Sequence, residues 1–120
     1  MFRVGVACIA ALVALTIAPA GASARSSYCS PTGDYCTATY KKGGVRWLNL
    51  RTFSFRGRVD VCVTTPSDEK TCHKFLLRRV PHDIFEIHVR WSRWYPTGER
   101  GKHKLRFLQG DSPIGPMLSF

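Results

Sequence analysis

Cysteine is the residue type whose spacing says most about the chemistry open to this chain. Cys29 and Cys36 bracket the stretch CSPTGDYC, and Cys62 and Cys72 bracket a longer interval, with six and nine residues inside the two pairs. Zinc sites usually place about two to four residues between cysteines, and redox sites favour C-x-x-C. His73 follows Cys72, but neighbours on a strand point to opposite faces, so the two cannot easily share a metal. We therefore expect disulfides, with no metal and no cofactor.

The pairing of Cys62 with Cys72 can be tested against the strand pattern around it. The segment 58–77 alternates apolar and polar side chains on both sides of a turn that begins at Pro66. A hairpin that opposes Cys62 and Cys72 would set apolar or oppositely charged residues across from one another, as sheets favour. The further pairs are Val59 with Phe75, Asp60 with Lys74, and Val61 with His73.

Proximity in sequence favours a second disulfide between Cys29 and Cys36. The residues between them include three turn formers, Pro31, Gly33 and Asp34. The stretch CSPTGDYC is therefore interpreted as a staple that ties an N-terminal segment into a tight turn.

Residues 1–24 have the layout of a cleavable secretory signal. Arg3 precedes an apolar run from Val4 to Ile17, and small residues lead to a cleavage site after Ala24. The alternative is a membrane anchor, but the run is shorter than the about 20 residues that a bilayer requires. We expect a secreted, extracellular protein, retained at the cell envelope, with no transmembrane segment after signal cleavage. Cys8 would be removed with the signal.

The remainder of the chain, residues 25–120, is typical of an all-β domain. Short alternating segments are separated by Gly, Pro and Asp turn signals, and residues 110–116 look like a loop. This pattern predicts a seven-stranded antiparallel immunoglobulin-like sandwich with two disulfides, preceded by a helical signal peptide. The expected strands are 35–40, 45–50, 56–65, 71–79, 84–91, 102–108 and 117–120.

Several motifs carry a resemblance to a known group of proteins. They are CSPTGDYC, the hairpin VDVCV…TCHKF, the stretch GKHKLRF and the ending SPIGPMLSF. With these motifs the chain resembles small secreted actinobacterial proteins of unknown function that have an immunoglobulin-like or fibronectin type III-like β-sandwich. The resemblance implies the fold and no activity. A weaker similarity is to neocarzinostatin-like carriers, in which the second disulfide follows the hairpin instead of preceding it.

Charge is the strongest indication of a partner. Without Arg3 the chain has 17 Lys and Arg against 8 Asp and Glu, a net charge of +9. Such a field attracts polyanions, and the expected partner is an anionic cell-wall polymer or polysaccharide. No specific nucleic acid is expected. The alternative is that the charge serves solubility and loose retention at a negative surface.

The cations are not spread evenly over the expected strands. In a fibronectin-like topology the third, fourth, sixth and seventh strands share a sheet, and alternation sets a basic stripe on its outer face. A solvated sheet face without a ligand is the alternative. The residues of the stripe are Arg56, Arg58, Lys74, Arg78, Lys102, Lys104 and Arg106.

The segment RWSRWYP interleaves aromatic rings with guanidinium groups. Trp91, Trp94 and Tyr95 beside Arg90 and Arg93 could stack on sugars or bases. The alternative is that the three rings close the end of the sandwich below a turn.

Enzyme motifs are absent from the sequence, so we expect no catalytic residues. The histidines are His73, His82, His88 and His103, and no G-x-S-x-G, H-E-x-x-H or phosphate loop accompanies them. The first hypothesis is a secreted non-catalytic module that binds anionic envelope polymer. The alternatives are a structural or adhesive surface protein with incidental charge, and a small secreted toxin, inhibitor or hydrolase.

Overall fold

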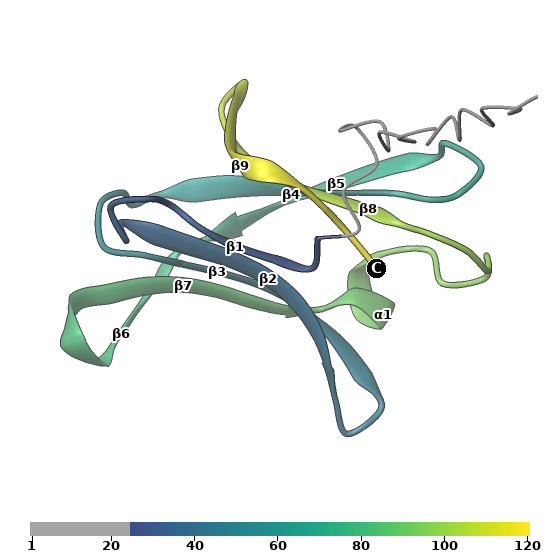
Figure 1. The fold of residues 1–120 in the computed structure, drawn as a ribbon, viewed down its shortest axis with the longest axis horizontal. Helices are drawn as coiled ribbons and strands as arrows, with labels where there is room; N and C mark the ends of the chain where they lie inside the picture. Colours follow the sequence, from purple (N-terminus) through teal and green to yellow (C-terminus); the bar gives the residue numbers. More distant parts are fainter. Residues whose placement is uncertain (1–24) are drawn as a thin grey trace, which may run out of the picture.

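Two antiparallel β-sheets pack against each other in residues 25–120, the part of the chain that the computed structural model describes (Figure 1). The expected signal segment, residues 1–24, lies outside the described residues. The five-stranded sheet has the order β1-β2-β3-β7-β6, with bounds Ser27–Cys29, Tyr35–Lys42, Val45–Thr52, Ile84–Arg90 and Arg78–Val80. The four-stranded sheet has the order β5-β4-β8-β9, with bounds Lys70–Leu76, Arg58–Thr64, Lys104–Gln109 and Ser112–Ser119.

Helical structure within residues 25–120 is confined to two short turns that flank β7. The 3-10 turn η1 spans Pro81–Asp83 and the α-helix α1 spans Trp91–Trp94. Within residues 25–120, no helix has the length and apolar character needed to cross a membrane. The described chain is therefore all-β, as the sequence predicts.

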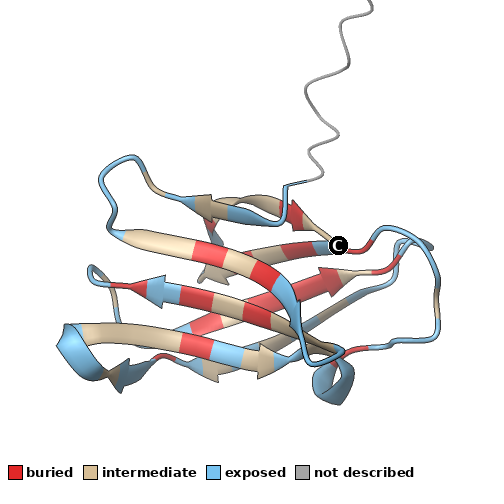
Figure 2. Cartoon of the chain, turned by 60° about the horizontal axis from the view of Figure 1, so that its bottom comes forward, coloured by how far each residue is buried: buried red, intermediate tan, exposed pale blue. Residues whose placement is uncertain are grey.

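Alternation along the strands builds the core between the two sheets. Leu48 and Leu50 of β3 and Val61 of β4 are fully buried, whereas Asn49 lies on the other face of β3. Figure 2 shows buried positions alternating with more exposed ones along the strands, and exposed loops at both ends. Each fully buried side chain of this kind contributes about 1.5–3 kcal/mol. The other buried hydrophobic residues of the core are Val59, Val63, Leu77, Ile87, Tyr95, Leu105, Phe107, Ile114 and Leu118.

The β4–β5 hairpin confirms the predicted register and disulfide. Cys62 pairs with Cys72 on adjacent strands and the two are bonded, with their Cα atoms 4.1 Å apart. The turn between the strands is closed by Asp68, whose amide donates to the carbonyl of Thr65. The three further pairs are those expected, Val59 with Phe75, Asp60 with Lys74, and Val61 with His73.

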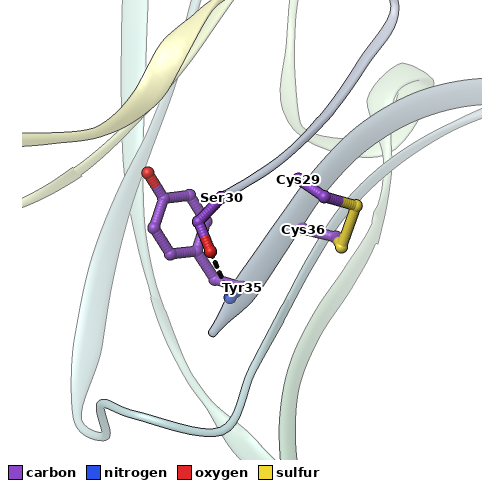
Figure 3. Close-up of a disulfide and its surroundings, with 4 residues drawn as sticks. All are labelled: Cys29, Ser30, Tyr35 and Cys36. Atoms are coloured by element: carbon purple, nitrogen blue, oxygen red, sulfur yellow. Dashed lines mark hydrogen bonds between the residues drawn. A yellow bond between two sulfur atoms is a disulfide. The ribbon is translucent and has the colours of Figure 1, made fainter. Parts of the chain in front are cut away.

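The second disulfide, Cys29–Cys36, joins β1 to β2 (Figure 3). Between the two cysteines the chain turns through Gly33, which has a φ of 75° and donates its amide to the carbonyl of Ser30. The Tyr35 amide donates to the Ser30 hydroxyl at 3.3 Å (Figure 3). The predicted staple is confirmed, and the tied N-terminal segment is itself the edge strand β1, which the sequence did not predict.

The predicted strand 71–79 is wrong, because two strands of different sheets occupy this segment. β5 ends at Leu76, and Leu77 turns into the core with its amide donating to the carbonyl of Gly57 at 2.8 Å. The next three residues form β6, which pairs with β7 in the other sheet. The chain therefore crosses from one sheet to the other at the buried Leu77. As a result, Arg78 lies in the five-stranded sheet and not on the predicted basic stripe.

The predicted loop 110–116 is also wrong, because β9 begins at Ser112. β9 is an edge strand, where the missing amides of Pro113 and Pro116 are tolerated. Its pairing with β8 shifts at a bulge that contains Gly115, whose φ is 73°. The proline and glycine signals therefore marked an irregular edge strand and not a loop.

Candidate functional site

The outer face of the four-stranded sheet carries five cations. On β4 and β8 the residues that alternate with the core valines and leucines point away from the other sheet, and the same holds for β5. Strands β3 and β7 cover only the inner face. We call this set the basic face, and its members are Arg58, Lys70, Lys74, Lys104 and Arg106.

Three strands position these cations in register. Thr64 of β4 has Lys70 of β5 on one side and Lys104 of β8 on the other. With adjacent strands about 4.8 Å apart, the Cα atoms of the two lysines are about 10 Å apart. Arg106 lies two residues along β8 from Lys104, about 7 Å away. Asp60, beside Lys74, is the acid within this face.

Four of the seven predicted members of the basic stripe lie on this face, and three lie elsewhere. Arg56 precedes β4, and its guanidinium carbon lies 4.6 Å from the ring centre of Phe85 in the other sheet. Arg78 is in β6, and Lys102 is in the loop before β8. Lys70 was missed because the strand was predicted to begin at residue 71, although alternation back from Cys72 and Lys74 would have included it.

None of the cations of the basic face forms an ion pair with a residue of the described part of the chain. The ion pairs there are Arg51–Glu86, at 2.7 Å, and Arg79–Asp83, both in the other half of the sandwich. Arg106 is half-buried, and its Nε has no hydrogen-bond partner among the described residues. A buried donor without a partner costs about 1–3 kcal/mol, so the Nε of Arg106 is a local cost of the fold at this position.

The three aromatic residues predicted to stack on a ligand differ in their exposure. Tyr95 is 5% exposed and its hydroxyl donates to the Val61 carbonyl at 2.6 Å, while burial raises the pKa of the phenol. Trp91 is half-buried against His103 and Phe120, with ring centres 5.1 and 5.2 Å away. These two rings close the end of the sandwich.

Trp94 alone of the three is exposed. Its ring is 40% exposed, although it packs edge-on against Phe75 with ring centres 5.2 Å apart. Among the three, only Trp94 offers a ring face to a ligand from solvent.

A second group of aromatic and basic side chains lies on the outer face of the five-stranded sheet. We call Tyr40, Trp47, His88 and Arg90 the aromatic cluster. Trp47 pairs with Tyr40 across β2–β3 and with Arg90 across β3–β7. The rings of Trp47 and His88 stack with centres 4.4 Å apart, and the Tyr40 hydroxyl lies 2.7 Å from His88 Nε2 in a hydrogen bond. Sequence reasoning missed this cluster because its members come from three strands.

Three of the histidines have surroundings that the structure defines. His88 bonds to Tyr40, while Glu86, two residues earlier, pairs with Arg51. His73 donates through Nε2 to the Trp94 carbonyl at 2.8 Å, and His103 is buried. No group of three or more histidines, cysteines or acids within residues 25–120 is placed to hold a metal ion.

Comparison with known proteins adds no assignment to these two surfaces. No protein-family model, curated protein or solved structure matches the chain. The functional interpretation therefore depends on the geometry and chemistry of the basic face and the aromatic cluster.

Proposed function

We propose that the protein is an exported, non-catalytic binding module that holds an anionic cell-envelope polymer on its basic face. The observation that carries this proposal is the set of five cations on one sheet face, none of them ion-paired within the described residues, with one acid among them. A linear polyanion supplies repeated negative groups to such a row, and each neutralised group releases counterions.

The spacing of the cations favours a site over a diffuse field. Lys70, Lys104 and Arg106 surround Thr64 and Cys62 on three adjacent strands, at separations of about 7–10 Å. The Debye length at physiological salt is about 8 Å, so the potentials of Lys104 and Arg106, about 7 Å apart, add, whereas that of Lys70, about 10 Å from Lys104, is screened more strongly. An anion approaching the centre of the face experiences several cations at once.

The strand order supports an immunoglobulin-like fold for the module. β2-β3-β7-β6 corresponds to strands A, B, E and D of that fold, and β5-β4-β8-β9 corresponds to C′, C, F and G. β1 is then an additional edge strand. In this arrangement the basic face is the outer surface of the C′CFG sheet.

Two features support export. Residues 1–24 have the composition of a secretory signal. Two disulfides stabilise a domain of 96 residues, and such bonds persist mainly in oxidising compartments outside the cytoplasm. Retention at a negatively charged envelope follows from the basic face.

The test compares two charge reversals of equal size. Lys70→Glu with Lys104→Glu changes the basic face, and Lys41→Glu with Lys42→Glu changes the exposed β2–β3 hairpin. Retention on immobilised teichoic acid should fall strongly for the first pair and little for the second. Equal losses would leave only a diffuse field, as expected of a structural or adhesive protein whose charge is incidental.

A further inference from the structure

The aromatic cluster borders a pocket of about 310 Å³ beside β7 and α1. It is lined by Trp47, His88, Val89, Arg90, Arg93 and Trp94. Small-molecule sites occupy roughly 300–1,000 Å³, so this pocket suits a single ring with its substituents and not a long polymer segment.

Local features of the fold leave the pocket open. β6 pairs with β7 only as far as Glu86, so the edge of β7 that faces away from β3 has no partner strand from Ile87 to Arg90 within the described chain. After Arg90 the chain enters α1, which brings Arg93 and Trp94 beside β3 and the free edge of β7. The label α1 in Figure 1 marks this corner of the fold.

The rings of the pocket are held in place before any ligand binds. Trp47 stacks on His88 at 4.4 Å between ring centres, and His88 is fixed in turn by its hydrogen bond to Tyr40. Trp94 is held edge-on by Phe75, at 5.2 Å, yet remains 40% exposed. Two indoles are therefore positioned at the pocket with little side-chain freedom left to lose on binding.

The charged groups of the pocket are cations without acidic partners. The Arg90 guanidinium carbon lies 5.5 Å from the Trp47 ring centre, and that of Arg93 lies 5.7 Å from the Trp94 ring centre. Neither arginine forms an ion pair with a described residue, and Glu86, the acid on the same face of β7, is held by Arg51. The pocket presents two guanidinium groups beside two indoles and no free carboxylate.

We propose that this pocket binds an acidic sugar residue of a glycan. Indole faces pack against the C–H face of a sugar ring, and a guanidinium pairs with a carboxylate, sulfate or phosphate through two parallel hydrogen bonds. Asn49, which pairs with His88 across β3–β7, donates its side-chain amide to the Ile87 carbonyl at 3.0 Å. The charged groups of the lining, Arg90 and Arg93, are hydrogen-bond donors, which match the acceptors of an anionic group.

This inference is independent of the proposed role of the basic face, because the two sites share no residue. A negative result for the pocket would therefore not count against polymer binding at the basic face, and the reverse also holds. The pairs Arg90 with Arg93 and Lys70 with Lys104 therefore serve as controls for each other.

The direct test is a titration of the full mature protein with trigalacturonate, followed through the three tryptophan indole N–H signals in NMR. The matched control ligand is fully methyl-esterified trigalacturonate, which keeps the rings and loses the charges. We expect the signals of Trp47 and Trp94 to shift with the acid and that of Trp91, packed against His103 and Phe120, to stay in place. Shifts confined to Trp91, or equal affinity for acid and ester, would overturn the proposal.

Variants separate the pocket from the general field of the protein. Arg90→Gln with Arg93→Gln should raise the Kd for trigalacturonate about tenfold or more, because charged hydrogen bonds are lost. Trp94→Ala should weaken binding as well, and its exposed site should allow normal folding. Lys70→Gln with Lys104→Gln should leave this Kd within about twofold. Equal weakening by the two basic pairs contradicts a site here, and so does tighter binding of adenosine monophosphate with the same indole shifts, which would make the pocket a nucleotide site.

Discussion

Removing the disulfide between Cys62 and Cys72 should destabilise the protein more than removing the disulfide between Cys29 and Cys36. Alanine is the suitable replacement at Cys62, because this residue is 3% exposed and a serine hydroxyl would be buried there. Alanine is used at the other three cysteines as well, so that the two double variants are matched. Both double variants remove one covalent loop and leave the strand pairing on either side of it in place.

The loop entropies of the two disulfides are similar, so burial decides the difference. Sequence separations of 10 and 7 residues give about 2.7 and 2.4 kcal/mol in the chain-entropy estimate. Loss of the buried sulfur of Cys62 adds about 1 kcal/mol, by comparison with a buried methylene group. Cys29 is exposed and Cys36 is half-buried, so the corresponding loss there is smaller.

Thermal and urea unfolding, followed by circular dichroism without reductant, measures both variants. At about 4–8 °C per kcal/mol for a domain of this size, the Cys62–Cys72 variant should melt roughly 15 °C or more below the wild type. The Cys29–Cys36 variant should melt at a temperature between the two. An unchanged melting temperature for the Cys62–Cys72 variant, or a larger loss in the Cys29–Cys36 variant, would refute the reasoning.

Three other predictions concern processing, the crossover between the sheets and a buried phenol. Mass spectrometry of exported protein should give a chain that begins at Arg25 and contains no free thiol; two or more free thiols would contradict the disulfide framework. Leu77→Ala should lower the free energy of unfolding by about 2–5 kcal/mol, because it leaves a cavity where the chain crosses between sheets; a loss below about 1 kcal/mol in urea unfolding would show that Leu77 does not anchor the crossover. The pKa of Tyr95 is raised by burial, so above about pH 10 the unfolded chain loses this proton while the folded chain keeps it, and stability falls. Tyr95→Phe should flatten that decline in unfolding experiments between pH 9 and 11, and an identical pH dependence in the variant would contradict the assignment.

The β4–β5 hairpin was predictable because its information is local. Alternation, the turn at Pro66 and the opposite charges of Asp60 and Lys74 all select one register, and the structure has that register. The disulfide between Cys62 and Cys72 follows directly from it.

The change of sheet at Leu77 was not predictable from the same pattern. Phe75, Leu76 and Leu77 form an apolar run, which a continuing strand accommodates as well as a crossover does. Burial of Leu77 in the core, with its amide bonded to Gly57, decides between the two, and it depends on residues distant in sequence.

The candidate surfaces were predictable to different extents for the same reason. Positions on β4, β5 and β8 follow from alternation, so Arg58 and Lys104 were correctly assigned to this face. Lys102 was assigned wrongly, because β8 begins at Lys104 and not at residue 102. The aromatic cluster requires the register of three strands, because Tyr40, Trp47 and Arg90 meet only through the pairing of β2, β3 and β7. No local pattern contains that register.

The most direct test of polyanion binding at the basic face is the salt dependence of the affinity for teichoic acid. For a flexible single-stranded polyanion, each neutralised group contributes about 0.7 to the slope of log K against log salt concentration. Lys70→Gln with Lys104→Gln should therefore reduce the magnitude of the slope by about 1.4, whereas Lys41→Gln with Lys42→Gln should leave it close to the wild-type value. Equal slopes for the two variants would contradict binding at the basic face.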